Sequence, residues 1–393
     1  MITVDEALSR VLALARPPRP ETVPLAQAHG RVLLEPARAR LTQPPFDASA
    51  MDGYAMRAAD MPGPLTVIGT SAAGHPWDGQ PRPGTAIRIF TGAAVPAGFD
   101  HVELQENVDR DGDRITVRTR SSGRNIRARG NDFAEGDSLP AGTVLTPARI
   151  GLLAAMNLDR VIVAARPVVA ILAGGDELVT PGTDPAPGQI ISSNDLALAA
   201  MVAEAGGEAR ILPIARDTVE SLTAAFRAAS DADLLVTIGG ASVGDHDLIG
   251  QVAVESGMAQ AFYKVALRPG KPLMAGRLGR TAMLGLPGNP VSAMVCGQLF
   301  MQPLIRRMLG LSAEQPLRQA VLGKALPAEG PRQHYLRARL STCDGLPVIT
   351  PFDDQDSARL ALMAQSDALL VRPAGDLARQ AGGVVTYLPI GAS

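Results

Sequence analysis

The sequence predicts a multidomain α+β and α/β protein, with a mostly parallel α/β sandwich domain, an inserted β-rich module, an N-terminal helical region and a small C-terminal β domain. Three observations lead to this prediction. The chain has 393 residues, which is more than a single hydrophobic core usually serves. Its 40 glycines and 32 prolines separate many short elements. The pattern of these elements changes near residues 167 and 315, first to alternating strands and helices and then back to strands.

The N-terminal third combines two helical segments with β-prone runs between them. Thr3 and Glu6 form a capping box before apolar residues at helical spacing, which predicts a helix over residues 3–15. Helical spacing returns at residues 146–156, and we expect the two helices to pack together. The intervening runs are short, and Asp111-Gly112 is typical of a hairpin turn. We therefore predict a discontinuous helical domain (residues 1–48 and 141–166) around a β-rich insertion (residues 49–140).

From residue 167 the sequence alternates between strands and helices, which predicts a mostly parallel sheet with helices on both faces. Asn194 is expected to cap a helix over residues 195–205, and Asp217 with Glu220 to begin a helix over residues 218–229. A longer helix follows from Val291. The expected strands cover residues 167–173, 209–214, 233–238, 259–265, 272–275 and 281–286. This α/β domain is predicted to span residues 167–314, and residues 315–393 a C-terminal β-barrel-like domain.

Composition excludes several functional classes. The chain is 46% hydrophobic and 19% charged, which is a globular rather than a disordered profile. Its net charge of −2 provides no general attraction to nucleic acid or to anionic membranes. Cys296 and Cys343 form no CxxC pair, which argues against a zinc site or a disulfide framework. Without a signal-like N-terminus or a long apolar run, we expect a cytoplasmic protein.

Four loops at the predicted carboxyl edge of the sheet have compositions suited to anions and metals. The loop of residues 174–178 carries Asp176 and Glu177, which are candidate metal ligands or proton carriers. Residues 239–244 form a glycine-rich strand exit whose amides can approach a phosphate. Asp245 and Asp247 follow it, and such acids suggest magnesium held jointly with phosphate oxygens. A plain tight turn and simple helix capping remain the alternatives for this loop.

The other two loops combine cations with prolines. Lys264, Arg268 and Lys271 surround a Pro-Gly turn, an arrangement that can bind a tetrahedral oxyanion, although a solvated rim is the alternative. Residues 286–292 join a strand to a helix whose N-terminus offers free amides. Each loop alone is weakly informative. Because the carboxyl ends of parallel strands meet at one edge, the four together predict an anion- and metal-binding site.

The β-rich insertion contributes three further strings. Residues 49–55 form a sharp loop with one acid, Asp52, and residues 87–93 end a strand at Thr91. Residues 123–132 place three arginines around a turn. An RNA-binding platform would need aromatic residues there, and Phe133 is the only one nearby. By themselves the arginines fit a solvated face as well as they fit a ligand site.

The ordered strings SAMDGYA, IRIFTGA, GRNIRARGND, GDEL, GGASVGDHD, RPGKP and LPGNPVS resemble the molybdopterin molybdenumtransferase family, which includes MoeA and the gephyrin E domain. The resemblance covers essentially the whole chain, and SAMDGYA with LPGNPVS is highly specific. It implies magnesium-dependent insertion of molybdate into adenylylated molybdopterin, with release of AMP. It also implies a four-domain chain with a MogA-like α/β domain. The homodimer would form through the discontinuous helical domain and share its active sites between subunits. Transient contact with the molybdopterin adenylyltransferase and with acceptor molybdoenzymes is expected, but no nucleic acid or membrane partner.

The resemblance also assigns residues. The catalytic positions are Asp52, Thr91, Asp132, Glu177, Asp217, Asp247, Lys264, Arg268 and Ser357. The substrate- or phosphate-binding positions are Gly239, Gly240, Ser242, Gly244, Lys271, Pro287, Gly288, Asn289, Pro290, Ser292, Arg124 and Arg127. Mg²⁺ is assigned to Glu177 and Asp247. Arg268 stands where lysine is usual in this family. Its planar guanidinium keeps the positive charge but replaces the compact ammonium group of lysine.

Two rival functions remain at this stage. An adenylyltransferase acting one step earlier uses the same α/β domain, but it does not explain the β-rich module with its SAMDGYA string. A catalytically inactive scaffold of the same fold would not need the polar motif residues, nearly all of which are present here.

Overall fold

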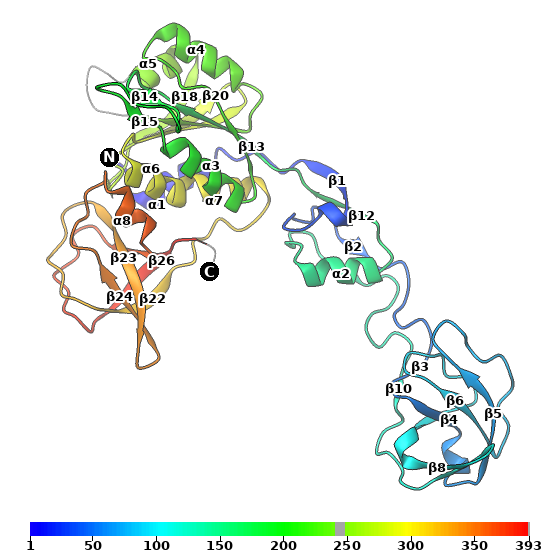
Figure 1. The fold of residues 1–393 in the computed structure, drawn as a ribbon. Coiled ribbons are helices and arrows are strands. Elements are labelled where there is room, and N and C mark those ends of the chain that lie inside the picture. The colour runs from blue at the N-terminus through cyan, green and yellow to red at the C-terminus, as the bar shows by residue number, and fades with distance from the viewer. Residues whose placement is uncertain (240–247, 392–393) are drawn as a thin grey trace. The chain divides into compact units, whose positions relative to one another are not determined.

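The computed structural model describes residues 1–239 and 248–391, which form two compact units (Figure 1). The large unit comprises Met1–Glu21 and Ala164–Ser393, and the small unit comprises Thr22–Val163. None of the helices in the described ranges combines the length and apolar composition that a membrane span requires. The predicted boundaries at residues 49, 140 and 315 lie inside these units and stay predictions.

The small unit begins and ends in a layer built from short elements. β1 (Pro20–Pro24) pairs with β12 (Arg160–Ala164), and β2 (Ala37–Arg38) pairs with β11 (Ser138–Leu139). η1 (Leu25–Gln27) and α2 (Pro147–Ala155) complete the layer. The Thr146 hydroxyl accepts a hydrogen bond from the N–H of Arg149 and so caps α2, as the predicted helix requires. The layer has its own hydrophobic core around Leu33, Leu145, Leu153 and Val163.

The inserted β-rich part is a six-stranded sheet in the order β7-β4-β6-β5-β9-β8. Its strands are β4 (Gly53–Met56), β5 (Leu65–Ser71), β6 (Thr85–Ile89), β7 (His101–Leu104), β8 (Val108–Asp111) and β9 (Arg114–Val117), with η2 (Ala58–Asp60) and η3 (Gln105–Asn107) between them. A separate pair joins β3 (Ala48–Ser49) to β10 (Ile126–Arg127). Successive side chains of β4 point to opposite faces of the sheet. Tyr54 and Met56 therefore belong to one apolar cluster and Ala55 to another. The predicted hairpin is confirmed, because β8 and β9 pair across Gly112, which has φ +56°.

The large unit contains the predicted mostly parallel sheet, in the order β16-β13-β17-β21-β20-β18. Its strands are β13 (Val168–Ala173), β16 (Glu208–Ile211), β17 (Leu234–Ile238), β18 (Met258–Lys264), β20 (Pro272–Leu278) and β21 (Thr281–Leu286). The pairs from β16 to β21 are parallel, whereas β20 runs antiparallel to both β21 and β18. β20 and β21 are joined by Gly279 and Arg280 alone, and so short a connection permits only an antiparallel pair.

Helices cover both faces of this sheet, as Figure 1 shows. α4 (Val219–Ala228) and α5 (Leu248–Glu255) lie on one face, and on the other lie α3 (Asn194–Glu204), α6 (Pro290–Cys296) and α7 (Gln302–Met308). The predicted long helix from Val291 is α6 and α7 joined through a π-helical segment, η4 (Gly297–Met301). β14 (Leu178–Val179) and β15 (Ile190–Ile191) form a small parallel pair.

Two predicted helix caps are wrong. α3 begins at Asn194 itself, with Ser193 in the cap position and no capping side-chain hydrogen bond. α4 is capped by Thr218, whose hydroxyl accepts from the N–H of Ser221 at 3.2 Å, rather than by Asp217. The side chain of Asn194 instead donates to the Gly288 carbonyl, a tertiary contact that propensity for helix starts does not reveal. Asp217 contacts Asp176 through its backbone N–H.

The first helix, α1 (Val4–Leu12), begins as predicted, because the Thr3 hydroxyl accepts from the N–H of Glu6 at 3.1 Å. Its partner was predicted wrongly. Val4, Ala7 and Val11 are buried, and α1 packs on α7, η4 and β18 in the large unit, whereas α2 belongs to the small unit. An apolar helical stripe predicts burial but not the surface that provides it.

The C-terminal part of the large unit is the expected β domain. Its strands are β22 (Arg318–Leu322), β23 (Gln333–Cys343), β24 (Leu346–Pro351), β25 (Ala368–Arg372) and β26 (Val384–Pro389), with α8 (Leu360–Ala364) beside them. The order β23-β24-β22-β26-β25 closes on itself through the β23–β25 pair, which removes the sheet edges. β19 (Leu267–Arg268) comes from the α/β part and adds to β23 in parallel. The cationic loop is therefore attached to the C-terminal domain.

Candidate functional site

A pocket of about 620 Å³ lies in the large unit where three parallel strands end. The strands end in register, because Ala173 pairs with Ile238 and Ile238 with Leu286. Beyond these residues the pocket is lined by Gly174, Glu177, Gly239, Pro287, Gly288, Asn289 and Pro290, together with residues 190–194, Pro272 and Ala358. The structure thus brings together loops that the sequence places more than one hundred residues apart.

Glycines hold the strand exits close together. The N–H of Gly239 donates to the Leu286 carbonyl at 3.1 Å, and a side chain added at Gly239 would meet the carbonyl oxygen of Gly174 at 3.3 Å. Gly239 also has φ +88°, which favours glycine. A Cβ on Gly288 would lie 3.6 Å from the Cα of Gly239. Backbone therefore faces the pocket, and backbone N–H groups are suitable donors for phosphate oxygens.

Glu177 is the predicted metal-binding carboxylate that the described part of the pocket contains. Its side chain lies over Gly175, where an added Cβ would be 2.5 Å from Oε2. The N–H of Gly175 donates to the Ala215 carbonyl at 3.1 Å, and the N–H of Asp217 donates to Oδ1 of Asp176 at 3.4 Å. Asp217 is therefore tied to the same loop but does not line the pocket.

The cationic loop reaches the pocket through Pro272 only, and the structure does not place Lys264, Arg268 or Lys271 in the lining. Lys264 lies with its Nζ 5.6 Å from the centre of the Tyr263 ring. Arg268 is exposed on β19. The loop itself is fixed, because the Lys271 carbonyl accepts from the N–H of Val265 at 3.1 Å.

Ser357 reaches the pocket edge from the C-terminal domain. Its hydroxyl accepts from Nδ2 of Asn289 at 2.9 Å, and its carbonyl accepts from the N–H of Val291 at 3.1 Å. Arg337, which is buried, holds this segment by donating to the carbonyls of Asp354 and Arg359. Ser292 is buried within α6 and does not line the pocket. The sequence did not predict a role for Arg337, because a single arginine within a strand belongs to no recognisable motif.

In the small unit, Asp52 and Thr91 form a pair. The backbone N–H of Thr91 and its hydroxyl both donate to Oδ1 of Asp52 at 2.7 Å. The hydrogen bond from the Thr91 backbone N–H lowers the pKa of Asp52 most, and the bond from the Thr91 hydroxyl lowers it further. The positive charge of Arg88 also lowers this pKa. Arg88 itself lies between the rings of Tyr54 and Phe90, with Cζ 5.1 and 4.9 Å from their centres.

The arginine string is attached to the Asp52 loop. The N–H of Ala50 donates to the Asn125 carbonyl at 2.9 Å, and Ile126 pairs with Ser49. Nε of Arg124 donates to the Asp100 carbonyl at 2.7 Å, so that this side chain also has a structural role. Arg127 is exposed on β10. Asp132 donates its N–H to the Gln43 carbonyl at 3.1 Å, and in the described ranges it forms no hydrogen bond with Asp52.

A buried carboxylate fastens the same region. Glu103 is fully buried and accepts from Nε2 of His101 (3.0 Å), Nδ2 of Asn107 (2.8 Å) and the N–H of Ser121 (2.9 Å). Burial acts to raise the pKa of Glu103, but the hydrogen bonds outweigh it and lower the pKa to about 2. The charged network joins β7 to the segment that leads into the arginine string.

Five predicted residues, Gly240, Ser242, Gly244, Asp245 and Asp247, lie outside the described residues. Within the described residues no group of three His, Cys, Asp or Glu side chains is placed to hold a metal ion. The oxygen donor of Glu177 nevertheless suits Mg²⁺, which commonly takes one or two carboxylates and completes its shell with phosphate oxygens and water.

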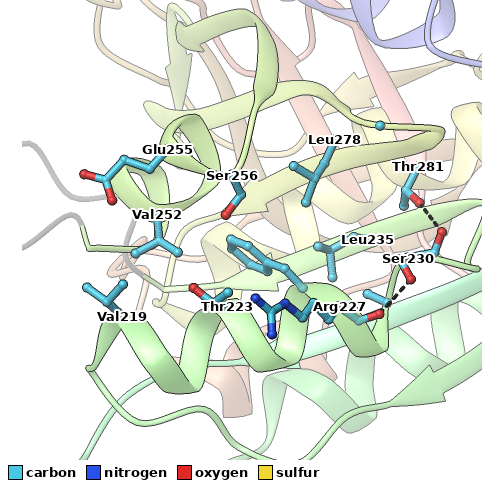
Figure 2. A pocket seen from close by; sticks show the side chains of 13 residues that line it. Val219, Thr223, Arg227, Ser230, Leu235, Val252, Glu255, Ser256, Leu278 and Thr281 are labelled. Carbon is cyan, nitrogen blue, oxygen red and sulfur yellow. Dashed lines mark hydrogen bonds between the residues drawn. The ribbon is translucent and has the colours of Figure 1, made fainter.

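A second pocket, of about 560 Å³, lies between α4, α5 and the β20–β21 hairpin (Figure 2). Its walls include the apolar side chains of Leu235, Val252 and Leu278. The Thr281 hydroxyl on its rim already donates to the Ser230 carbonyl. None of the predicted site residues lines it among the described residues, and the turn that borders it is the β20–β21 hairpin at Gly279. The pocket at the strand ends is therefore the candidate site.

Comparison with known proteins finds relatives along nearly the whole chain. Family models described as "MoeA N-terminal region (domain I and II)", "Probable molybdopterin binding domain" and "MoeA C-terminal region (domain IV)" match residues 2–157, 170–307 and 319–390. The chain is 37% identical to a molybdopterin molybdenumtransferase of Nostoc sp., over 94% of this chain and 89% of that protein. It is 38% identical to molybdopterin molybdenumtransferase 2 of Mycobacterium tuberculosis, over 95% and 96%. A crystal structure of a MoeA molybdopterin biosynthesis protein from Pyrococcus horikosii has a TM-score of 0.87 at 29% identity and covers 100% of both chains.

Proposed function

Because this chain belongs to the MoeA family of molybdopterin molybdenumtransferases, we propose that it inserts molybdate into adenylylated molybdopterin, with Mg²⁺, and releases AMP. One observation supports this most directly. The register of β13, β17 and β21 brings Gly174, Gly239 and Gly288 to one pocket that also contains Glu177. Such a pocket suits a ligand that carries both phosphate groups and a metal ion.

The residues of the large unit have distinct proposed tasks. The backbone N–H groups of Gly288 and Asn289 would bind the pyrophosphate, and Glu177 would hold Mg²⁺ together with phosphate oxygens. Bound Mg²⁺ would supply stabilisation of the negative charge that develops on the departing AMP. Lys264, Arg268 and Lys271 would attract molybdate as a doubly charged substrate. Asp217 and Ser357 would orient the loops to which they are bonded.

The small unit would contribute an oriented negative group. Asp52 has a lowered pKa because of the hydrogen bonds from Thr91, so it stays ionised and accepts protons poorly near neutral pH. We therefore assign Asp52 and Thr91 to orienting substrate rather than to proton transfer. Asp132, Arg124 and Arg127 belong to the string attached to this loop, and we assign the exposed Arg127 to substrate anions.

The proposed reaction is tested by supplying purified protein with adenylylated molybdopterin, Mg²⁺ and molybdate. We expect AMP release and active cofactor. AMP that appears only with ATP and free molybdopterin would assign the chain to the earlier adenylyltransferase step. Absence of turnover in both mixtures would instead leave a scaffold of the same fold.

We also propose a cytoplasmic homodimer whose active sites each combine residues of both subunits, with transient contacts to the adenylyltransferase and to acceptor molybdoenzymes. Asp52 and Glu177, two candidate carboxylates, belong to different compact units. An active site shared between subunits would combine one carboxylate from each subunit. Mixing an Asp52→Ala chain with a Glu177→Ala chain should restore part of the activity. Confirmed heterodimers that remain inactive would contradict shared sites.

A further inference from the structure

Two asparagines stand at helix starts without capping them. Asn194 is the first residue of α3 and Asn289 is the N-cap residue of α6, yet neither helix start has a capping side-chain hydrogen bond. Asparagine is among the best N-cap residues, and a cap is worth about 1 kcal/mol. Both amides are used elsewhere, so the contacts that they make instead are informative.

Both contacts fix the same turn, residues 287–290, which we call the glycine turn. Nδ2 of Asn194 donates to the carbonyl of Gly288 at 2.7 Å, and Nδ2 of Asn289 donates to the Ser357 hydroxyl at 2.9 Å. The first contact ties the turn to α3, and the second ties it to the C-terminal domain. Both residues also line the pocket.

The centre of the glycine turn depends on these contacts. Pro287 is buried, but Gly288 is exposed and has no side chain to pack. The backbone of Gly288 lies beside Gly239 at the pocket wall, where an added Cβ would be 3.6 Å from the Cα of Gly239. The two amide hydrogen bonds therefore act together with the packing of Pro287 to keep this wall beside the ends of the strands.

We propose that Asn194 is a positioning residue, which holds the glycine turn beside Gly239 in the position that the phosphate-bearing part of the substrate requires. The proposal rests on the proposed function, since it takes the pocket as the substrate site. α3 does not need this bond to fold, because Leu198, Met201 and Val202 are buried beneath it. Loss of one partly solvated hydrogen bond costs only about 1 kcal/mol, whereas a small displacement of a binding wall has large effects on binding and rate.

The test uses Asn194→Ala and Asn194→Asp in the full chain. Aspartate keeps the shape but places a carboxylate oxygen against the Gly288 carbonyl, so we expect its effect to be the larger. For Asn194→Ala we expect the KM for adenylylated molybdopterin to rise about tenfold with kcat changed less than about threefold. Hydrogen exchange at the N–H of Val291, which is bonded to Ser357, should become faster. The melting temperature should fall by only a few degrees.

Gln302→Ala is the matched control. Nε2 of Gln302 donates to the Met201 carbonyl and to Glu204, both at 3.1 Å, so it also ties an amide to α3, but at the end remote from the pocket. This variant should lose comparable stability with an unchanged KM. If Asn194→Ala and Gln302→Ala raise KM equally, or if exchange at Val291 is unaltered, Asn194 does not position the turn.

Binding of inorganic pyrophosphate, measured by calorimetry, separates this inference from the proposed reaction. Weaker pyrophosphate binding by Asn194→Ala, with faster exchange at Val291, supports the positioning role even if the wild-type protein releases no AMP. Unchanged pyrophosphate binding overturns it even if the wild-type protein is active.

Discussion

The small unit gathers its candidate residues in a hydrogen-bonded cluster, whereas the large unit gathers them around a cavity. In the cluster Asp52 receives two bonds from Thr91, and its loop is bonded to the arginine string. In the large unit, the pocket of about 620 Å³ lies at the ends of parallel strands, and Gly174, Gly239 and Gly288 are among the residues that line it. The first arrangement presents one charged group in a fixed direction, and the second provides space and donors for a ligand. The two regions therefore suit different tasks.

Glycine illustrates the difference. In the small unit, a Cβ on Gly53 would lie 1.9 Å from the carbonyl oxygen of Glu103, because β4 and β7 pair there. In the large unit, a Cβ on Gly288 would meet nothing closer than 3.6 Å. Gly53 is thus required by packing of the fold, and Gly288 leaves room that a substrate can use.

The largest effect is expected for Gly53→Ala. The clash is with backbone, which cannot move without breaking the β4–β7 pair, so the small unit should lose at least about 3 kcal/mol of unfolding free energy. Urea unfolding followed through Trp77, the single tryptophan, measures this loss in the small unit. Gly151→Ala is the control, since nothing lies within 4 Å of its Cβ position in α2, and it should stabilise by about 1 kcal/mol. Equal stability of the two variants would refute the packing argument.

Gly288→Ala should separate fold from function. The added methyl makes an ordinary contact with Gly239, so the melting temperature should change by no more than about 2 °C. It occupies the pocket, however, and we expect the KM for adenylylated molybdopterin to rise about tenfold. Gly330→Ala, at an open position of the same unit, should leave KM unchanged. A Gly288→Ala enzyme with normal KM would show that substrate binds away from this wall.

A smaller effect on stability than that of Gly53→Ala concerns pH and the Glu103 network. Its pKa is lowered from 4.5 to about 2 in the folded protein. Glu103 therefore stabilises the small unit above pH 4.5, and this contribution is lost as the pH falls from 4.5 towards 2. Glu103→Gln should cost about 1–3 kcal/mol at pH 7 because its partners lose their charged acceptor. The difference from wild type, followed by Trp77 fluorescence in urea, should shrink at pH 3. A difference that is constant with pH would contradict the assignment.

Much of the fold followed from local patterns. Continuous apolar runs predicted β13, β17 and β21, and period-3.6 apolar spacing predicted α1, close to their observed bounds. The reason is that these strands are buried on both faces whereas α1 buries one face. Turn chemistry at Asp111-Gly112 predicted the β8–β9 hairpin. The partner of α1 was not predictable, because an apolar stripe fits any apolar surface.

For the candidate site, the sequence motifs identified the loops that carry its residues, but not the residues that these loops contact. Thr91 was assigned by resemblance, and the structure adds that it bonds to Asp52. Asn194 was predicted to be a cap, and Arg337 was not singled out at all. Both act through contacts with residues distant in sequence, Gly288 for one and the segment that carries Ser357 for the other. Local propensity does not contain such pairings.

The sequence by itself determined the class of each segment, the family resemblance and the loops in which chemistry resides, because these depend on neighbouring residues and on strings that need no coordinates. Only the tertiary structure decided how those loops meet. The parallel register that aligns Ala173, Ile238 and Leu286 brings three glycines to one pocket. Two asparagine amides then fix its wall. Distances of this kind arise from packing between segments far apart in the chain, where burial and polar pairing of the whole unit outweigh the preference of any single residue.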